Sequence, residues 1–152
     1  MTPEQRLAEL GITLPQAAAP AANYVPSVLA GGLLHISGQI PFAEDGSLIR
    51  GRLGADMDVP AGQAAARRCA VGLIAQIEAA LGDLSRVKRI VKLGVFVNST
   101  PEFTDQPEVG NGASDLMVAV FGDAGRHARS AVGVAVLPRG VAVEVDAIIE
   151  VA

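Results

Sequence analysis

Near the C-terminal end of the sequence, a lone arginine and a lone carboxylate stand among small apolar residues. Arg129 follows Ala128 in the segment Ala128-Arg129-Ser130-Ala131-Val132, and Glu144 lies between two valines. A buried charge without a partner costs several kcal/mol, so each of them requires either an oppositely charged neighbour or a charged ligand. Because a guanidinium grips a planar carboxylate through two parallel hydrogen bonds, this pair of residues predicts a pocket for a small acid.

Two strands must carry these charges, and the sequence predicts them at 129–137 and 141–151, joined as a hairpin by a tight turn. In that register Glu144 lies opposite Gly133. The two charges then share a face of the sheet but lie on the order of 13 Å apart along it, at ~3.3 Å per residue. They cannot pair directly within one chain. Either each has a local partner, or a neighbouring subunit brings its Glu144 to this Arg129.

Simpler interpretations of both charges stay open on the sequence alone. Arg129 can be a surface charge at the start of a strand, and Glu144 can be a rim residue that pairs with Arg139 or Lys92. Asp146 shares the side-chain direction of Glu144 in a strand, so it can equally be the carboxylate that faces solvent.

Other polar residues are candidates for a site of this kind. Tyr24, the only tyrosine, either packs at the edge of the core or contributes its hydroxyl. Ser37 and Gly38 end a strand of small residues, where a hydroxyl and free backbone N–H groups can meet a ligand. No base adjoins Ser37, which argues against a nucleophile. His35 and His127 lie far apart with no Cys/His cluster, so we expect structural roles for them and no metal site.

The composition fits a single domain over residues 1–152 and argues against several classes of function. A net charge of -4, a pI near 5.1 and 3% aromatic residues oppose nucleic-acid binding, which needs a basic surface and stacking side chains. Motifs for phosphate loops, zinc and nucleophile elbows are missing, so we expect no cofactor. No apolar run approaches the ~20 residues that span a bilayer, and the single Cys69 cannot form an internal disulfide. We therefore expect a cytoplasmic protein with no membrane partner.

The periodicity of the apolar residues predicts an alternation of strands and helices. Thr2 and Pro3 begin a short helix that ends at Gly11, and an Ala/Pro connector runs to about residue 22. There follow, in order, strands 24–29 and 33–37, a second hairpin around Asp45-Gly46 that runs to about Leu53, a helix from Asp58 to Gly82, a strand 89–98, and a helix that begins near 108–112 and ends at Gly122. This order predicts an α+β fold in which two main helices cover one face of a mixed sheet.

The other face of that sheet needs a cover. The last two strands are interpreted as apolar on both sides, whereas a sheet with one wet face alternates. No third helix of sufficient size is predicted. A neighbouring copy of the chain is the economical cover.

Several of these segments together resemble the RidA (YjgF-type) family of reactive-intermediate imine deaminases, from about Tyr24 to the end of the sequence. The similar segments are Tyr24-Val25, Ile36-Ser37-Gly38-Gln39-Ile40-Pro41, Val95-Phe96-Val97, Ala128-Arg129-Ser130 with Leu137-Pro138, and Val143-Glu144-Val145-Asp146-Ala147-Ile148. The Ser-Gly-Gln-Ile-Pro and Ala-Arg-Ser…Leu-Pro blocks are specific only in combination. The resemblance implies a chorismate-mutase-like fold, a homotrimer, and clefts between its subunits.

The resemblance also implies an activity, the hydrolysis of small 2-imino acids of the 2-aminoacrylate type to 2-keto acids and ammonia. In family deaminases, positions matching Arg129 and Glu144 line the cleft, where the first fixes the substrate carboxylate and the second activates water. The residues expected to bind and orient the substrate are Tyr24, Ser37, Gly38, Asn111 and Ala131. Asn111 aligns only with a one-residue gap, and Ala131 replaces a family cysteine while keeping its backbone N–H.

Two features leave an alternative open. The N-terminal helix and the Gly-rich segment 108–112 are similar to those of a longer RidA-like subgroup whose activity is less certain. A trimer that binds small carboxylates without turnover would need the same arginine. A third interpretation, RNA cleavage, conflicts with the acidic net charge.

Overall fold

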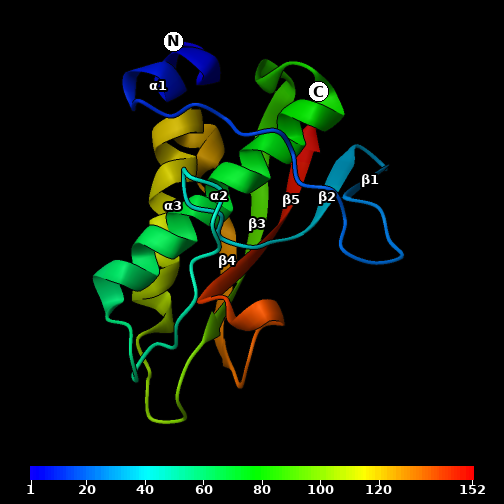
Figure 1. Cartoon of the computed structure of the whole chain (residues 1–152). Coiled ribbons are helices and arrows are strands. Elements are labelled where there is room, and N and C mark those ends of the chain that lie inside the picture. Colours follow the sequence, from blue (N-terminus) through cyan, green and yellow to red (C-terminus); the bar gives the residue numbers. More distant parts are fainter.

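The computed structural model describes all residues from Met1 to Ala152 as one α+β unit. Its elements are α1 (Pro3–Glu9), β1 (Ser27–Ala30), β2 (Leu33–Gln39), α2 (Val59–Leu81), β3 (Val87–Asn98), α3 (Gln106–Phe121), β4 (Ala128–Val134) and β5 (Val143–Val151). The five strands form one sheet in the order β1-β2-β5-β3-β4. Only β3 and β4 run parallel, and α2 and α3 pack side by side against the sheet (Figure 1). The predicted mixed sheet with two main helices on one face is confirmed.

The helix boundaries follow local chemistry, as the sequence predicts. Thr2 caps α1 through a reciprocal capping box with Gln5. Asp58 caps α2 by accepting a hydrogen bond from the backbone N–H of Ala61 at 3.0 Å, and Gly82 ends that helix at φ 80°. Helix α3 begins at Gln106, slightly before the Gly-rich segment 108–112 where its start was expected.

The core lies between the helices and the sheet face that they cover. Side chains of β5 alternate between the two faces, and those of β3 do so from Leu93 to Val97, with Leu93, Val95 and Val145 on the covered face. The largest fully buried side chains are Leu53, Leu73, Ile74, Ile77, Leu84, Ile90, Leu93, Leu116, Met117, Ile149, Val71 and Val95. Cys69 is buried among them, and burial raises the pKa of its thiol well above the ordinary value. None of the helices is both long and apolar enough to cross a membrane.

The predicted C-terminal hairpin is wrong. β4 and β5 are not neighbours, because β3 lies between them and pairs with β4 in parallel and with β5 antiparallel. Arg129 aligns with Leu93 of β3, whereas Glu144 aligns with Phe96. Positions 93 and 96 are three residues apart, so their side chains point to opposite faces. Arg129 therefore lies on the helix-covered face and Glu144 on the open face, which corrects the expectation that they share one.

The sequence-based interpretation of the last strands as apolar on both sides is also wrong for β5. Val143, Val145 and Ala147 are buried on the helix side, and the open side carries the half-buried carboxylates Glu144 and Asp146. The sequence hides this alternation because Ile148, an apolar residue, follows Glu144 and Asp146 on the open side. Apolar side chains do remain on the open face at the flanking strands, where Val28 is 51% exposed and Val132 is 46% exposed.

The second hairpin, expected around Asp45-Gly46, is reduced to a turn. A single bridge joins Phe42 to Leu48, and no regular strand follows to Leu53. Asp45 closes the turn by accepting hydrogen bonds from the backbone and hydroxyl of Ser47.

Candidate functional site

Arg129 projects from the edge strand β4 onto the first turns of α3. Its Nη1 donates hydrogen bonds to Asn111 Oδ1 at 3.0 Å and to Ser114 Oγ at 3.1 Å, and its Nη2 donates to the backbone carbonyl of Pro107 at 3.0 Å. A Cβ on Gly110 would lie 3.0 Å from Nη1, so the guanidinium lies directly over that glycine. These four residues form one stripe of the helix, which acts as a cradle for the arginine.

The cradle leaves part of the guanidinium available. Arginine has five N–H donors, and the protein uses two on Nη1 and one on Nη2. The Nε donor and the second Nη2 donor remain, side by side on one edge. All three partners in the cradle are neutral, and the only ion pair of the chain joins Arg126 to Asp123. Arg129 therefore keeps an uncompensated charge and a free bidentate edge, as a carboxylate-binding arginine requires.

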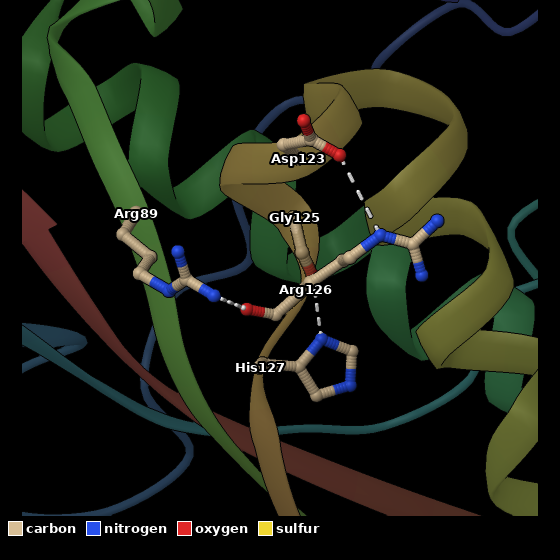
Figure 2. Close-up of polar contacts among 5 residues, drawn as sticks. All are labelled: Arg89, Asp123, Gly125, Arg126 and His127. Atoms are coloured by element: carbon tan, nitrogen blue, oxygen red, sulfur yellow. Dashed lines mark hydrogen bonds and ion pairs between the residues drawn. The ribbon is translucent and has the colours of Figure 1, made fainter.

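His127 stands beside this arginine at the end of the segment that enters β4. Its Nδ1 lies 2.6 Å from the carbonyl oxygen of Gly125, and its Nε2 lies 2.8 Å from Ser114 Oγ. Figure 2 shows the contact between this ring and the Gly125 carbonyl. The backbone of the same turn is also fixed from β3, because Arg89 donates a hydrogen bond to the carbonyl of Arg126 at 2.7 Å. Burial, with a smaller contribution from Arg129, lowers the pKa of His127, so the ring is neutral at neutral pH.

A small surface pocket of about 280 Å³ lies in front of these groups. Its lining residues are Asn111, Ser114, Asp115, Val118, Arg126, His127 and Arg129. This is the arginine half of the candidate site.

The carboxylate half lies elsewhere, in a cavity of about 680 Å³. The lining residues that the sequence had singled out are Tyr24, Ser37, Gly38 and Glu144, and the connector 18–22 forms an apolar wall. An irregularity in the β2–β5 ladder between Ile36 and Gln39 turns this stretch of β2 toward the carboxylate. A Cβ on Gly38 would overlap with the Glu144 carboxylate, so a larger residue at this position would displace that side chain.

Glu144 is half-buried and has no cationic partner within 4.0 Å, although Arg139 lines the same cavity. Burial and then the neighbouring Asp146 raise the pKa of Glu144. Burial also raises the pKa of Asp146 itself, against a hydrogen bond from the Gly94 backbone. The ion pairs of Glu144 with Arg139 or Lys92, which the sequence left open, are absent. An unpaired carboxylate with a raised pKa is a stronger base than an ordinary glutamate, which suits it to accept a proton from a bound water molecule.

The two hydroxyls of this cavity are held by the backbone. Ser37 Oγ donates to the carbonyl of Val25 at 2.9 Å, and the Tyr24 hydroxyl accepts a hydrogen bond from Ala21 N at 3.3 Å. Tyr24 is 47% exposed and therefore can reach a ligand. Ala131 lines neither cavity and packs against the core beside β3.

The structure thus brings Arg129 together with Asn111, and Glu144 together with Tyr24, Ser37 and Gly38, but does not join the two groups. Ser114 and His127 were not predicted as part of the arginine group. Ser114 follows Asn111 by three residues on a helix, and this spacing is the signal that could have revealed it. No group of three or more His, Cys, Asp or Glu side chains is placed to hold a metal ion.

Comparisons with known proteins find relatives over nearly the whole chain. Residues 4–150 match the family model described as "YjgF/chorismate_mutase-like, putative endoribonuclease". The chain is 61% identical over 145 residues to Protein TCP17 of Trypanosoma cruzi, covering 95% of this chain and 91% of that protein. It is also similar to the crystal structure of a putative endoribonuclease from Shewanella oneidensis, at 39% identity and TM-score 0.96, covering 99% and 100% of the two chains. Escherichia coli TdcF with bound serine matches at 27% identity and TM-score 0.64, over 90% and 94%.

Proposed function

Because the chain belongs to the YjgF/RidA family, we propose that it hydrolyses small 2-imino acids to 2-keto acids and ammonia, in clefts between the subunits of a homotrimer. One observation carries the proposal: each chain holds a free arginine edge on one sheet face and an unpaired, half-buried carboxylate on the other. Neither half is complete alone. A second copy that brings its Glu144 cavity to this Arg129 completes both.

The surface of the chain supports such an assembly. Arg129 lies on an edge strand, where a second copy can approach it, and the open sheet face carries the exposed apolar side chains of Val28 and Val132. Apolar surface of this kind gains free energy when a partner covers it. Trimeric assembly would therefore use the same contact for stability and for building the site.

In the proposed reaction Arg129 binds the substrate carboxylate through its Nε and Nη2 donors. Glu144 accepts a proton from a water molecule, whose oxygen forms a bond to the imine carbon. The C=N π electrons move to the nitrogen as this bond forms, which gives a carbinolamine. Glu144 then returns its proton to that nitrogen, and the C–N bond breaks with its electrons leaving on ammonia. The carbinol oxygen forms the keto group and gives its hydroxyl proton back to Glu144. An iminium carbon is already electrophilic, so this chemistry proceeds by proton transfer and positioning alone.

The remaining residues orient the substrate in this proposal. Tyr24 and Ser37 hold it on the Glu144 side, Asn111 holds the arginine, and backbone N–H groups near Ala131 fix the amine end. The serine bound to TdcF supports the choice of a small amino-acid-like ligand for this chain. A net charge of -4 and the acidic pair Glu144 and Asp146 on the open face oppose the alternative of an RNA substrate.

Ammonia release from imino acids generated in solution by an amino-acid oxidase tests the proposal. We expect the wild-type chain to accelerate release, and Glu144→Gln to reduce kcat by roughly 10²–10⁴-fold with little change in ligand affinity. Glu150→Gln, on the same strand but outside both cavities, is the matched control. A chain that binds small carboxylates yet never exceeds the spontaneous rate would instead be the non-catalytic binding trimer.

Mixed trimers test whether the site is shared. Arg129→Ala and Glu144→Gln chains are each expected to be inactive, and after verified subunit exchange some clefts of the mixture regain both groups. Recovery of activity supports a shared site. No recovery would mean that one chain supplies the whole site.

A further inference from the structure

The direction of the Arg129 side chain depends on a hydroxyl whose own direction is set by a histidine. We propose that Ser114 and His127 are positioning residues that fix the arginine edge presented to the ligand, an inference that rests on the proposed carboxylate-binding role of Arg129. Neither residue belongs to the motifs that identified the site.

The proton positions follow from the hydrogen-bond partners. A backbone carbonyl only accepts, so the 2.6 Å contact between His127 Nδ1 and the Gly125 oxygen places the ring proton on Nδ1. In the neutral ring Nε2 is then an acceptor. The hydroxyl of Ser114, 2.8 Å away, must donate its single proton to that nitrogen. Its lone pairs are left for Arg129 Nη1, which lies 3.1 Å from Oγ.

The histidine is itself held in place. Gly125 is buried, and a Cβ there would overlap with the main chain at Met117, so the turn that supplies the carbonyl packs tightly on α3. Arg89 anchors the next carbonyl from β3 (Figure 2). The relay from Gly125 through His127 and Ser114 to Arg129 therefore starts from rigid backbone on one side and ends at the ligand-binding group on the other.

The relay decides which edge of the guanidinium is free. With Ser114 and Asn111 as acceptors, both Nη1 donors are occupied and the ligand meets only the Nε and Nη2 edge. Without the Ser114 oxygen, Nη1 regains a free donor and one of the three restraints on the side chain is lost. A ligand carboxylate can then still bind the Arg129 guanidinium, but it can do so through more than one edge.

Binding of 2-oxobutyrate, measured by titration calorimetry, tests the inference together with ¹⁵N NMR of the arginine Nε and Nη groups. We expect Ser114→Ala to raise Kd by about 3- to 10-fold, to release the slow rotation of Arg129 Nη1, and to change kcat far less than KM. Ser114→Thr keeps the oxygen and should restore both readings. His127→Phe, which keeps a ring without acceptors, should weaken binding in the same direction. Ser130→Ala is the control, because this serine neighbours Arg129 in β4 on the opposite face.

An unchanged Kd and unchanged Arg129 resonances in Ser114→Ala would overturn the inference, and so would a Ser114→Thr variant that fails to rescue a weakened Ser114→Ala. The calorimetric and NMR measurements do not depend on turnover. If the ammonia assay fails while the Ser114 and His127 effects on binding persist, the deaminase proposal falls and the positioning role stands.

Discussion

At the scale of single residues, the two central charges of the candidate site, Arg129 and Glu144, have no counter-ion. Arg129 has only neutral partners in its cradle, and Glu144 is half-buried against Gly38 with no cation in contact. Arrangements of this kind lower the stability of the fold locally. They persist at functional sites because they keep a charged group available for a ligand. Both residues can therefore be probed by changes that conserve size and remove one property.

Replacing Arg129 with lysine keeps the charge and removes the bidentate edge. We expect the binding of small carboxylates to weaken by ~1.5–3 kcal/mol, in line with the loss of a charge-assisted hydrogen bond, while folding changes little. Calorimetric titration with 2-oxobutyrate measures the loss. Arg86→Lys, an exposed change outside both cavities, is the control. Equal affinity in wild type and Arg129→Lys would show that Arg129 is only a surface charge.

Glu144→Gln should stabilise the chain at neutral pH, although it abolishes the proposed base. The folded pKa of Glu144 is raised, so its ionised form is disfavoured in the folded state, and this loss of stability develops as pH rises through the folded pKa. Below the unfolded pKa the carboxyl is neutral in both states and the effect vanishes. For a half-exposed group we expect a gain in Tm of roughly 1–3 °C at pH 7.5 and none at pH 3.5.

Thermal melts at the two pH values, with the exposed Glu102→Gln as a control, measure this difference. A Tm gain for Glu144→Gln that is equal at both pH values would show that side-chain packing, not ionisation, is responsible.

At the scale of elements, the helices could be predicted from the sequence and the pairing of the last strands could not. Capping residues such as Thr2, Asp58 and Gly82 act within one turn, so their signal is local. The choice of partner for β4 depends on α3, which carries the chain across and lays β4 parallel to β3. The short segment 138–140 is compatible with a hairpin turn, and nothing local reveals that β5 enters between β2 and β3.

The start of α3 is rich in glycine and gives no clear helix signal in the sequence. Two of its glycines are required by different neighbours in the structure. Gly110 makes room for the Arg129 guanidinium, a mobile group, whereas a Cβ on Gly112 would overlap with the main chain of Gln63 in α2. Both glycines weaken the helix pattern in the sequence, because glycine is unfavourable in helices. The contacts that require them come from other elements.

Gly112→Ala should therefore destabilise the chain by about 1–3 kcal/mol, because two helix backbones must separate. Gly110→Ala is the matched comparison two residues away: it gains helix propensity of ~0.5–1 kcal/mol and displaces only the guanidinium, so it should keep stability and lose carboxylate affinity. Urea unfolding and ligand titration of both variants separate the two effects. Similar stability losses in the two would contradict this assignment.

At the scale of the whole molecule, the family, the α+β class and most candidate residues could be predicted from sequence blocks, but the faces on which those residues lie could not. The predicted separation of Arg129 from Glu144 within one chain is correct, although its reason was wrong: opposite faces separate them, not a hairpin register. The proposed trimer now depends on the open face and the edge strand.

Light scattering at micromolar concentration should give a mass of about three times the 15.5 kDa chain. Lys replacement of Val132, which is 46% exposed on the open face, should shift this mass downward and reduce ammonia release in parallel, because a charge would have to be buried in the contact. A fully active species of 15.5 kDa would refute the shared cleft.

The central place of β5 in the sheet also constrains how the chain can reach its native state. β5 is the only link between the β1–β2 pair and the β3–β4 pair, and it follows all four of them in the sequence. During synthesis the first four strands leave the ribosome before the strand that joins them, so the sheet closes only after Val143–Val151 have emerged. Until then the edges of β2 and β3 expose unpaired backbone groups, and the growing chain depends on late, long-range pairing to cover them.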